Sequence, residues 1–266
     1  MQRTERTGRL VLLLAETPLA AIVANTFLSK FPEAVILREA PEPKSDVLKR
    51  RRRLMGTTAA LSQAAAGLLV RARRRGHRRR IDEICRIHDF DADWLSVAER
   101  ASDVRDVASV NSDACVSALR EIDPECVVVY GTRLLGTALL GAIEAPFINY
   151  HAGLTPMYRG QHPGYWALAY GDAAHAGVTV HLIDRGVDTG DVLAQARVPL
   201  HRRRDTLATF QWVQMAYGLP LLVAAAEQAL RGKLTPRKAP TALPSANHLP
   251  PRLGTYVANG LRAGVW

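Results

Sequence analysis

Three polar residues stand at spacings that suit acyl-transfer chemistry: Asn149, His151 and, further along the chain, Asp188. Alternation along an extended strand end places Asn149 and His151 on the same side. The segment Gly-Val-Asp-Thr-Gly-Asp (186–191) puts Asp188 in a turn whose glycines let the backbone approach a ligand. An amide can donate to an oxyanion, an imidazole can move protons, and a carboxylate can orient and charge that imidazole. These residue types predict an acyl-transfer site.

The sequence around these three residues predicts an α/β fold with a Rossmann-like, doubly wound, mostly parallel sheet. A strand–helix–strand spacing opens the chain, and buried-type strands recur before and after the site. We expect strands at 9–15, 34–38, 126–130 and 147–150, and a β-pair at 178–183 and 192–198 with Asp188 in its loop. Helices are predicted at 19–30, 111–121, 134–143, 162–170 and 205–231.

Two segments stand apart from this pattern. A basic insert at about 44–88 is predicted to be helical from about 49, after a loop at 39–48, with arginine clusters at 50–53 and 71–80. The tail from Leu234 carries five prolines and is predicted to be an irregular arm. We therefore expect a catalytic domain at 1–204, with 205–266 forming a C-terminal helix and a proline-rich tail on the same domain.

Composition narrows the class of protein. The apolar content of 48% supports a real core. Three widely spaced cysteines argue against a zinc site or a disulfide framework and suit a reducing cytoplasm. The polar start is not of signal-peptide type, and no apolar run reaches the ~18 residues of a spanning helix. We expect a cytoplasmic enzyme, with attachment to a membrane surface as an alternative.

The motif Asn149-x-His151-x-x-Leu154-x-Pro156-x-x-Arg159-Gly160, followed by 177–181 and by Val-Asp-Thr-Gly-Asp-Val-Leu at 187–193, resembles the folate-dependent formyltransferase family. That family includes glycinamide ribonucleotide, methionyl-tRNA and sugar N-formyltransferases of one-carbon metabolism. The resemblance covers residues 105–200 well and the first 38 loosely. It implies 10-formyltetrahydrofolate as the formyl donor, a primary amine as the acceptor, and no metal.

The resemblance also implies roles for individual residues. The catalytic residues of the family fall on Asn149, His151 and Asp188. The segments matching the folate pocket supply Gly131, Thr132, Arg133, Leu134, Leu135, Ile183, Asp184, Gly186 and Val187. Three residues where the acceptor could approach, with helix packing as the alternative, are His162, Tyr165 and Trp166. Thr179 and His181 match a strand beside the triad, and for His181 a core role and substrate contact stay open.

The chemistry expected of the triad follows from its residue types. Asn149 and a protonated His151 would stabilise a tetrahedral oxyanion by hydrogen bonds. Asp188 close to His151 would raise the imidazole pKa and keep it charged near neutrality. Asp188 could also help to remove the proton from the attacking ammonium.

Differences between this chain and the known types of the family narrow the choice of acceptor. Glycinamide ribonucleotide formyltransferases carry a glycine-rich phosphate loop where this chain reads Ala15-Glu16-Thr17-Pro18. Methionyl-tRNA formyltransferases carry a C-terminal β-barrel, for which the residues after Leu200 are too few. We expect a small-molecule acceptor such as an amino sugar or a nucleotide-linked sugar. A methionyl-tRNA or glycinamide ribonucleotide formyltransferase-like enzyme, a formyltetrahydrofolate hydrolase and a catalytically silent binding protein are the alternatives.

The basic insert carries most of the net charge of +10. Residues 44–86 hold fourteen Lys or Arg against three acids, a local charge of +11. Three hypotheses fit: a solvated helical pair, a surface for anionic lipid or another phosphate-bearing ligand through Arg50–Arg80, or an RNA contact limited to phosphates because aromatic residues are missing from 44–86. The proline-rich tail leaves a homodimer open.

Overall fold

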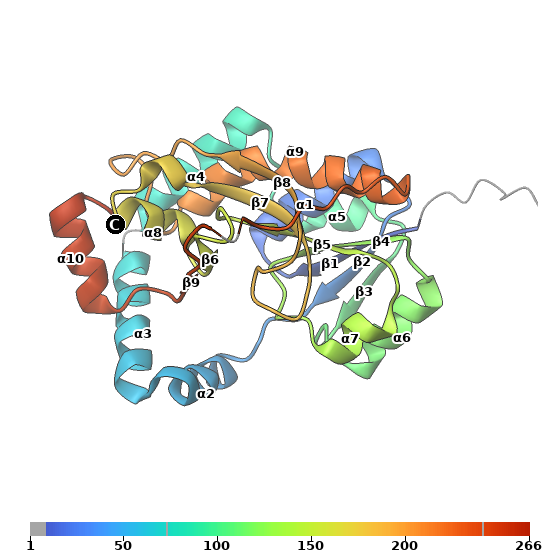
Figure 1. Cartoon of the computed structure of the whole chain (residues 1–266), viewed down its shortest axis with the longest axis horizontal. Helices are drawn as coiled ribbons and strands as arrows, with labels where there is room; N and C mark the ends of the chain where they lie inside the picture. The colour runs from blue at the N-terminus through green and yellow to red at the C-terminus, as the bar shows by residue number, and fades with distance from the viewer. Residues whose placement is uncertain (1–8, 73, 241) are drawn as a thin grey trace, which may run out of the picture.

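A seven-stranded sheet forms the centre of the computed structural model, which describes residues 9–72, 74–240 and 242–266 (Figure 1). The strand order is β3-β2-β1-β4-β5-β7-β8. Its strands are β1 (Leu10–Ala15), β2 (Val35–Glu39), β3 (Val104–Val107), β4 (Cys126–Tyr130), β5 (Phe147–His151), β7 (Gly177–Leu182) and β8 (Val192–Arg197). A second sheet pairs β6 (Arg159–Gly160) with β9 (Asn247–His248). The polar start at 1–8 lies outside the described residues.

The five strands from β3 to β5 run parallel, whereas β7 is antiparallel to both β5 and β8. β1 and β4 are continuous apolar runs because helices cover both of their faces. The predicted α/β fold with a mostly parallel sheet is therefore confirmed. The antiparallel β7–β8 pair also matches the predicted β-pair, and its loop holds Asp188.

Helices form a layer on each face of the sheet (Figure 1). One face is covered by α1, α5 and α9, and the other by α6 and α7. The helices are α1 (Pro18–Lys30), α2 (Lys44–Met55), α3 (Thr57–Ala72), α4 (Arg74–His88), α5 (Trp94–Arg100), α6 (Asp113–Ile122), α7 (Thr137–Ala142), α8 (Pro163–Ala169), α9 (Phe210–Leu230) and α10 (Leu253–Ala263), with a short 3₁₀ helix at Ala173–His175.

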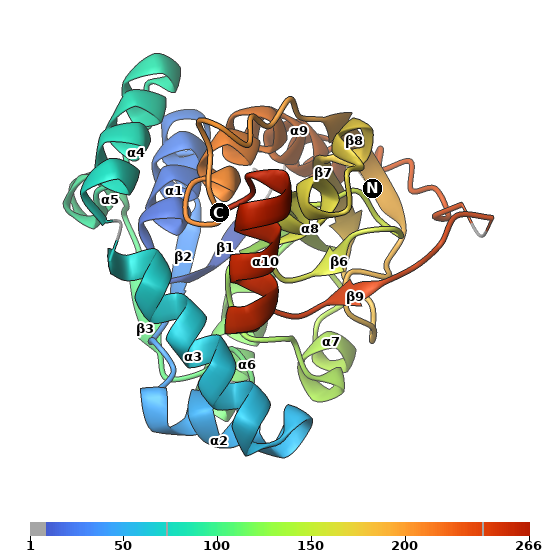
Figure 2. The same cartoon turned by 90° about the vertical axis from the view of Figure 1, so that its left-hand side faces the viewer.

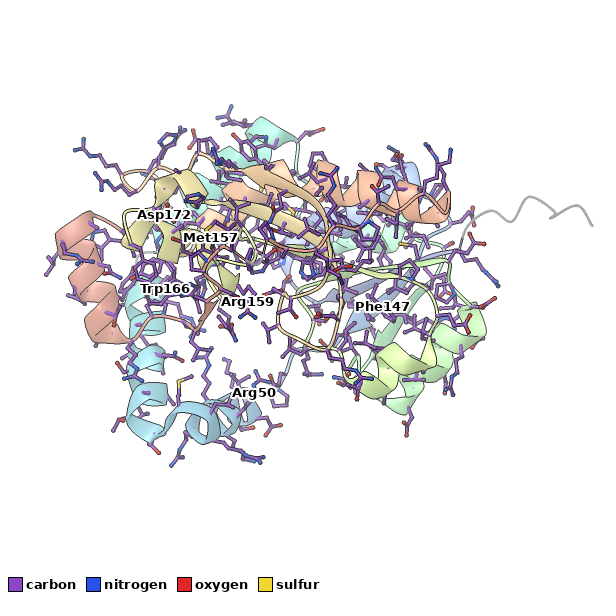
Figure 3. The ribbon with its side chains drawn as sticks, viewed as in Figure 1. Arg50, Phe147, Met157, Arg159, Trp166 and Asp172 are labelled. Atoms are coloured by element: carbon purple, nitrogen blue, oxygen red, sulfur yellow. The ribbon has the colours of Figure 1, made fainter. Side chains whose placement is uncertain are left out.

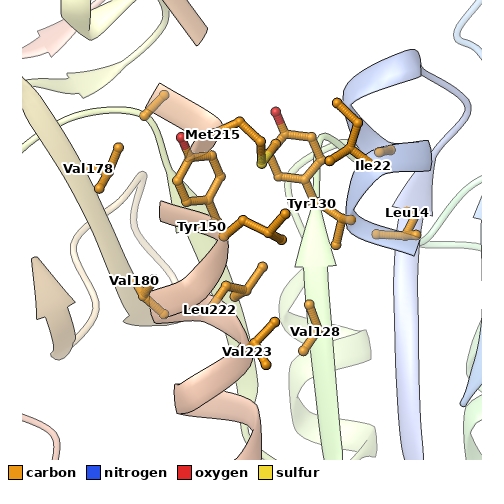
Figure 4. Packing of buried hydrophobic residues seen from close by; sticks show 14 of the residues in the cluster. Leu14, Ile22, Val128, Tyr130, Tyr150, Val178, Val180, Met215, Leu222 and Val223 are labelled. Atoms are coloured by element: carbon orange, nitrogen blue, oxygen red, sulfur yellow. The ribbon is translucent and has the colours of Figure 1, made fainter. Parts of the chain in front are cut away.

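The larger core lies between the sheet and α9 (Figure 4). Tyr150 of β5 is buried there beside Tyr130 of β4, with ring centroids 5.5 Å apart. α9 crosses the Tyr150 ring at Gly218, where an added Cβ would overlap the ring. This close approach fixes α9 over β5, the strand that carries Asn149 and His151.

The basic insert is helical, as predicted, but its first helix begins at Lys44 rather than after a loop ending at 48. Pro43 stands at the N-cap and straight-chain Lys, Arg, Leu and Met residues follow, which favour helix. The insert is held at its far end by Arg80, which donates to the buried Asp205 at 2.8 Å. Residue 73, within the arginine cluster 71–80, lies outside the described part.

The prediction of an irregular tail is wrong for its last part, which contains β9 and the helix α10. The prolines end at Pro251, so nothing interrupts the helix from Leu253 onward. Buried Tyr256, Asn259 and Gly260 attach α10 to the body. The sequence also missed α5 and the edge strand β3, both too short for a clear pattern. Among the described helices, none combines the length and apolarity that a membrane span requires.

Candidate active site

Asn149 and His151 lie at the carboxyl end of β5, facing β7 across an antiparallel ladder. The register pairs Asn149 with His181 and His151 with Thr179. Two residues apart on one strand, Asn149 and His151 share a face of the sheet, as the sequence predicts. His151 is buried and Asn149 is partly exposed.

Asp188 reaches the same place from the loop between β7 and β8. Its backbone adopts a left-handed conformation, with φ of 52°. Thr189 Oγ1 and the Gly186 N–H donate to Asp184, and Arg159 donates to the Val187 carbonyl at 2.8 Å. These bonds hold the loop so that the Asp188 side chain, 15% exposed, faces the end of β5.

The structure brings the three predicted catalytic residues together. Asp188 Oδ2 lies 3.4 Å from His151 Nδ1 and accepts a 2.9 Å hydrogen bond from the Gly160 N–H. Asp188 Oδ1 lies 3.6 Å from His181 Nε2. The resulting cluster is one carboxylate flanked by two imidazoles and one backbone donor.

Backbone contacts fix the tautomer of each imidazole. His151 Nε2 lies 2.7 Å from the Tyr158 carbonyl oxygen, which can only accept, so this nitrogen carries a proton. In His181, Nδ1 donates in the same way to the Leu182 carbonyl at 2.8 Å. With its proton on Nδ1, His181 can accept at Nε2 from the Asn149 amide, which lies 3.1 Å away. One amide proton of Asn149 is thus used, and the other is available to a ligand.

The expectation that His151 stays charged near neutrality is wrong. Burial lowers the pKa of His151 below its ordinary value, although the Asp188 charge and the Tyr158 carbonyl oppose this effect. Burial alone would raise the pKa of Asp188, but the two neighbouring imidazoles and the Gly160 N–H outweigh it and lower that pKa to about 2. Near pH 7 the cluster therefore pairs an ionised carboxylate with a neutral imidazole.

This arrangement also changes the role of His151. Its Nε2 is bound to the Tyr158 carbonyl and its Nδ1 faces Asp188, so neither nitrogen is free to bind an oxyanion. In the neutral imidazole, the lone pair of Nδ1 points toward the Asp188 carboxylate, which is also only an acceptor. A proton placed between these two atoms would form a hydrogen bond. The pair is therefore a proton acceptor, and Asn149 is the member with a free donor.

The two segments predicted to hold the folate directly follow β4 and β7. Leu135 and Ile183 pack against the same apolar cluster, and the Ile183 N–H donates to the Phe147 carbonyl at 2.8 Å. Gly131 has φ of 73°, while Leu134 is 68% exposed. Exposed positions in the two segments are Gly131, Leu134, Asp184 and Gly186, and partly exposed ones are Thr132, Leu135 and Val187.

Arg133 is placed differently from the expected pocket edge. Its guanidinium donates to the carboxylate of Glu39 at 2.9 Å and to the Ala108 and Ala40 carbonyls. The side chain of Glu39 is 4% exposed. Arg133 therefore joins the ends of β2, β3 and β4, and its charge compensates a buried carboxylate.

The three predicted acceptor residues do not act alike. Tyr165 is fully buried and accepts from the amide of Asn259 at 3.0 Å, so substrate contact by this side chain is corrected to a core role. Trp166 is half-buried and donates to the Leu249 carbonyl. His162 precedes α8 in a left-handed conformation, and burial lowers its pKa to about 4.

Sequence reasoning missed the contribution of the tail. β9 pairs with β6, and Ser245 accepts from Arg159 Nε at 3.0 Å. Arg159 and Trp166 are labelled in Figure 3. His248 stacks on Tyr158 and Trp166. Contacts with the tail, about 90 positions away in sequence, thus fix the segment that supplies the Tyr158 carbonyl and the Gly160 N–H. The Arg159-Gly160 dipeptide was the sole sequence signal for this region.

No group of three or more His, Cys, Asp or Glu side chains within the described ranges has the arrangement of a metal site. The cluster at Asp188 consists of one carboxylate and two imidazoles whose protonated nitrogens already have carbonyl partners. Its chemistry, as placed, is that of proton transfer.

Comparisons with known proteins agree with this architecture. A family model described as Formyl transferase matches residues 84–214. A methionyl-tRNA formyltransferase of Synechococcus sp. (strain JA-3-3Ab) is 39% identical over 110 residues, which cover 41% of this chain and 33% of that protein. The chain thus spans about a third of the length of this curated relative.

Solved structures share the fold at low sequence identity. Glycinamide ribonucleotide transformylase 1 from Symbiobacterium toebii has a TM-score of 0.57 at 18% identity, covering 89% of this chain and 96% of its own. An N-formyltransferase from Helicobacter canadensis, solved with folinic acid and dTDP-3-aminofucose, has a TM-score of 0.55 at 14% identity and covers 90% and 70%. At such identities the likeness concerns the fold.

Proposed function

We propose that this chain, whose residues 84–214 match the Formyl transferase family model, transfers a formyl group from 10-formyltetrahydrofolate to a primary amine of a small-molecule acceptor. The observation that carries the proposal is the convergence of Asn149, His151 and Asp188, with Asp188 Oδ2 3.4 Å from His151 Nδ1. The folinic acid bound by the Helicobacter canadensis enzyme supports a folate donor.

In this proposal the acceptor amine enters as an ammonium and meets two proton acceptors. Asp188 is ionised because its pKa is about 2, and His151 is neutral because burial lowers its pKa. The pair removes the ammonium proton and leaves the amine with the lone pair needed for attack. General-base catalysis of this kind contributes about 10²–10⁴ in rate.

Asn149 is the oxyanion donor in this proposal. One of its amide protons is held by His181 Nε2 at 3.1 Å, which fixes the plane of the amide. Because the plane of the amide is fixed, the second amide proton of Asn149 is already oriented for an oxyanion, and the side chain does not have to change rotamer during the reaction. Removing a single donor of this type costs about 10²–10³ in turnover elsewhere, and a similar loss is expected for Asn149→Ala.

The residues present fit a pterin-bearing donor in chemical type. The segments at 131–135 and 183–187 offer exposed glycines and the exposed apolar side chain of Leu134, which suit a flat, amide-bearing ring. When bound, the folate would supply the activated formyl group. Gly131, Thr132, Leu134, Leu135, Ile183, Asp184, Gly186 and Val187 remain the proposed donor-binding set, and Arg133 supports it from behind.

The test combines donor binding with transfer. Isothermal titration with 5-formyltetrahydrofolate, a stable analogue, and a transfer assay against a panel of amines would be run on the wild type, Asp188→Asn and Asp191→Asn. Asp191 is a matched control because its carboxylate pairs with the exposed Lys238 at 2.9 Å. We expect transfer to fall by about 10²–10⁴ in Asp188→Asn alone.

Three results would contradict the proposal. No folate binding by the wild type would favour a silent binding protein. Formate release without any amine would favour a hydrolase. Equal transfer rates in Asp188→Asn and the wild type would exclude the proton-acceptor role of the pair.

A tRNA acceptor is the second candidate function. It is favoured by the methionyl-tRNA formyltransferases among the relatives and by the basic insert. Including methionyl-tRNA beside amino sugars and nucleotide-linked sugars in the same panel separates the two. Faster formylation of the tRNA than of every small amine would replace the primary proposal.

A further inference from the structure

Helices α2 and α3 lie side by side at one edge of the molecule (Figures 1 and 2), and the only acid in these two helices is Asp46 in the first turn of α2. Residues 47–81 contain twelve Lys or Arg and no Asp or Glu. The sequence alone leaves open whether this charge is only a solvated helical surface. What the structure adds is the placement of the apolar side chains between the arginines.

Helix α3 has two different faces. Its inner face buries Ala59, Ala60, Gln63 and Ala66. It is attached to the tail, since Gln63 donates to the Pro250 carbonyl at 2.7 Å and Ser62 accepts from the Leu253 N–H. Its outer face presents Leu61 and Leu68, which are 57% and 64% exposed and stand two turns apart on the same side.

The neighbouring helices extend this exposed apolar surface. Leu54, at the end of α2, is 71% exposed. α10 lies beside α3 in both views, and its Leu261 is 78% exposed (Figures 1 and 2). The sequence from 228 to the last residue also contains no acid. Exposed leucines therefore occur on three adjoining elements, in stretches of sequence (47–81 and 228–266) that contain no Asp or Glu.

Arginines flank the leucines at both ends of α3. Arg52 and Arg53 precede it, Arg71 lies in its last turn, and Arg75, Arg78 and Arg79 follow it, all exposed. Within the part of the chain that the structure describes, none of these six has a carboxylate at ion-pair distance, whereas Lys49, Arg50 and Arg80 do. These guanidinium groups are available to an anionic partner.

We propose that the surface formed by Leu54, Leu61 and Leu68 with the flanking Arg52, Arg53, Arg71 and Arg75 binds an anionic lipid bilayer. Interfacial helices combine leucines that enter the head-group boundary with Lys and Arg that contact anionic lipids. An RNA partner would use the arginines but has no use for exposed leucines, and base stacking requires aromatic side chains, which residues 44–86 lack. The surface thus matches a bilayer better than a nucleic acid.

Vesicle flotation tests this proposal independently of any enzymatic activity. The whole protein would be mixed with vesicles of phosphatidylcholine alone or with about 30% phosphatidylglycerol, at low and high salt. We expect binding to the anionic vesicles that weakens with salt, and none to the neutral ones. Leu61→Ser/Leu68→Ser and, separately, Arg52→Gln/Arg53→Gln should each lower the partition coefficient about tenfold.

Two control variants make the same types of substitution at exposed positions outside the proposed surface. Leu95→Ser alters a leucine that is 71% exposed on α5, and Arg120→Gln removes an exposed arginine of α6. Both should bind vesicles like the wild type, and circular dichroism should show all four variants folded. Because the altered side chains are exposed, loss of binding then reports on the surface itself.

Other occupants of the surface give different results. Failure of the wild type to float with anionic vesicles at low salt would overturn the proposal. A second result would also overturn the proposal: the protein binds tRNA but no vesicles, and the tRNA binding is lost in Arg52→Gln/Arg53→Gln but kept in Leu61→Ser/Leu68→Ser. A dimer in light scattering that becomes a monomer in the leucine variant would assign the surface to a second copy.

Discussion

The backbone N–H of Gly160 donates a 2.9 Å hydrogen bond to Oδ2 of Asp188. The two residues are 28 positions apart, Gly160 in the short strand β6 and Asp188 in the loop between β7 and β8. The contacted oxygen is the one that faces His151. The tail strand β9 pairs with β6 and thus contributes to the orientation of the carboxylate.

Gly160→Ala is expected to damage this arrangement in two ways. Gly160 has φ of 84°, and an added Cβ would overlap Asn247 and the His248 carbonyl of β9. We expect a loss of stability of about 1–3 kcal/mol and a fall in transfer of at least about tenfold. Gly171→Ala is the control, because it shares a positive φ of 76° but meets no atom within 4 Å. Equal effects in both variants would limit the role of Gly160 to backbone conformation.

The pH dependence of transfer should reflect the neutral state of His151. Because burial lowers the pKa of His151, the imidazole remains a proton acceptor through neutrality, and kcat/KM should fall only below its ordinary value of 6.5. The Asp188 charge opposes this lowering, so its removal in Asp188→Asn should move the acid limb of the residual activity to still lower pH. A limb that moves to higher pH would contradict the assignment.

The same shifts bear on folding stability. Both His151 and Asp188 have native pKa values below their ordinary ones, so the unfolded chain binds more protons on acidification. The contribution of Asp188 is complete above about pH 4 and is lost as the pH falls toward 2. That of His151 begins to decline below 6.5. Urea unfolding of the wild type at pH 7 and pH 5 should show the lower free energy at pH 5.

Tyr165→Phe should lower stability without changing acceptor affinity. The substitution removes the oxygen that accepts from the buried Asn259 amide at 3.0 Å. An unsatisfied buried donor costs about 1–3 kcal/mol, which urea unfolding would detect. Tyr170→Phe, whose side chain is 59% exposed, is the control. A raised acceptor KM with unchanged stability would restore the substrate-contact interpretation of Tyr165.

Arg133→Met should destabilise the fold because it leaves the Glu39 carboxylate buried without its cation. Breaking a buried pair from one side typically costs about 3–5 kcal/mol. Combining it with Glu39→Gln, which removes the buried charge and keeps one of the two oxygens that accept from the Val110 and Arg133 N–H groups, should cost less than the sum of the single changes. Additive losses, or a loss of folate affinity without a loss of stability, would instead place Arg133 in the donor pocket.

The strand elements were predictable from the sequence because their signals are local. Cys126–Tyr130 is a continuous apolar run with three β-branched valines at its centre, and Phe147–His151 contains two polar residues that alternation puts on one face. Helices were harder to predict from the sequence where tertiary contacts decide whether and where they form. α10 forms among proline-rich neighbours because Tyr256 and Asn259 are buried against α8 and the C-terminal Trp266.

The sequence by itself indicated the three site residues: strand alternation puts Asn149 and His151 on one face, and the joint motif spacing, through the family resemblance, adds Asp188. Only the tertiary structure decided their states. The charge of His151 depends on burial by chain segments far from it in sequence, and the orientation of Asp188 depends on a backbone donor supported by the tail. Likewise Tyr165 and Trp166, neighbours in sequence, differ because α10 covers one and leaves the other half-exposed. Local patterns specify elements, whereas solvation and partner identity are properties of the packed whole.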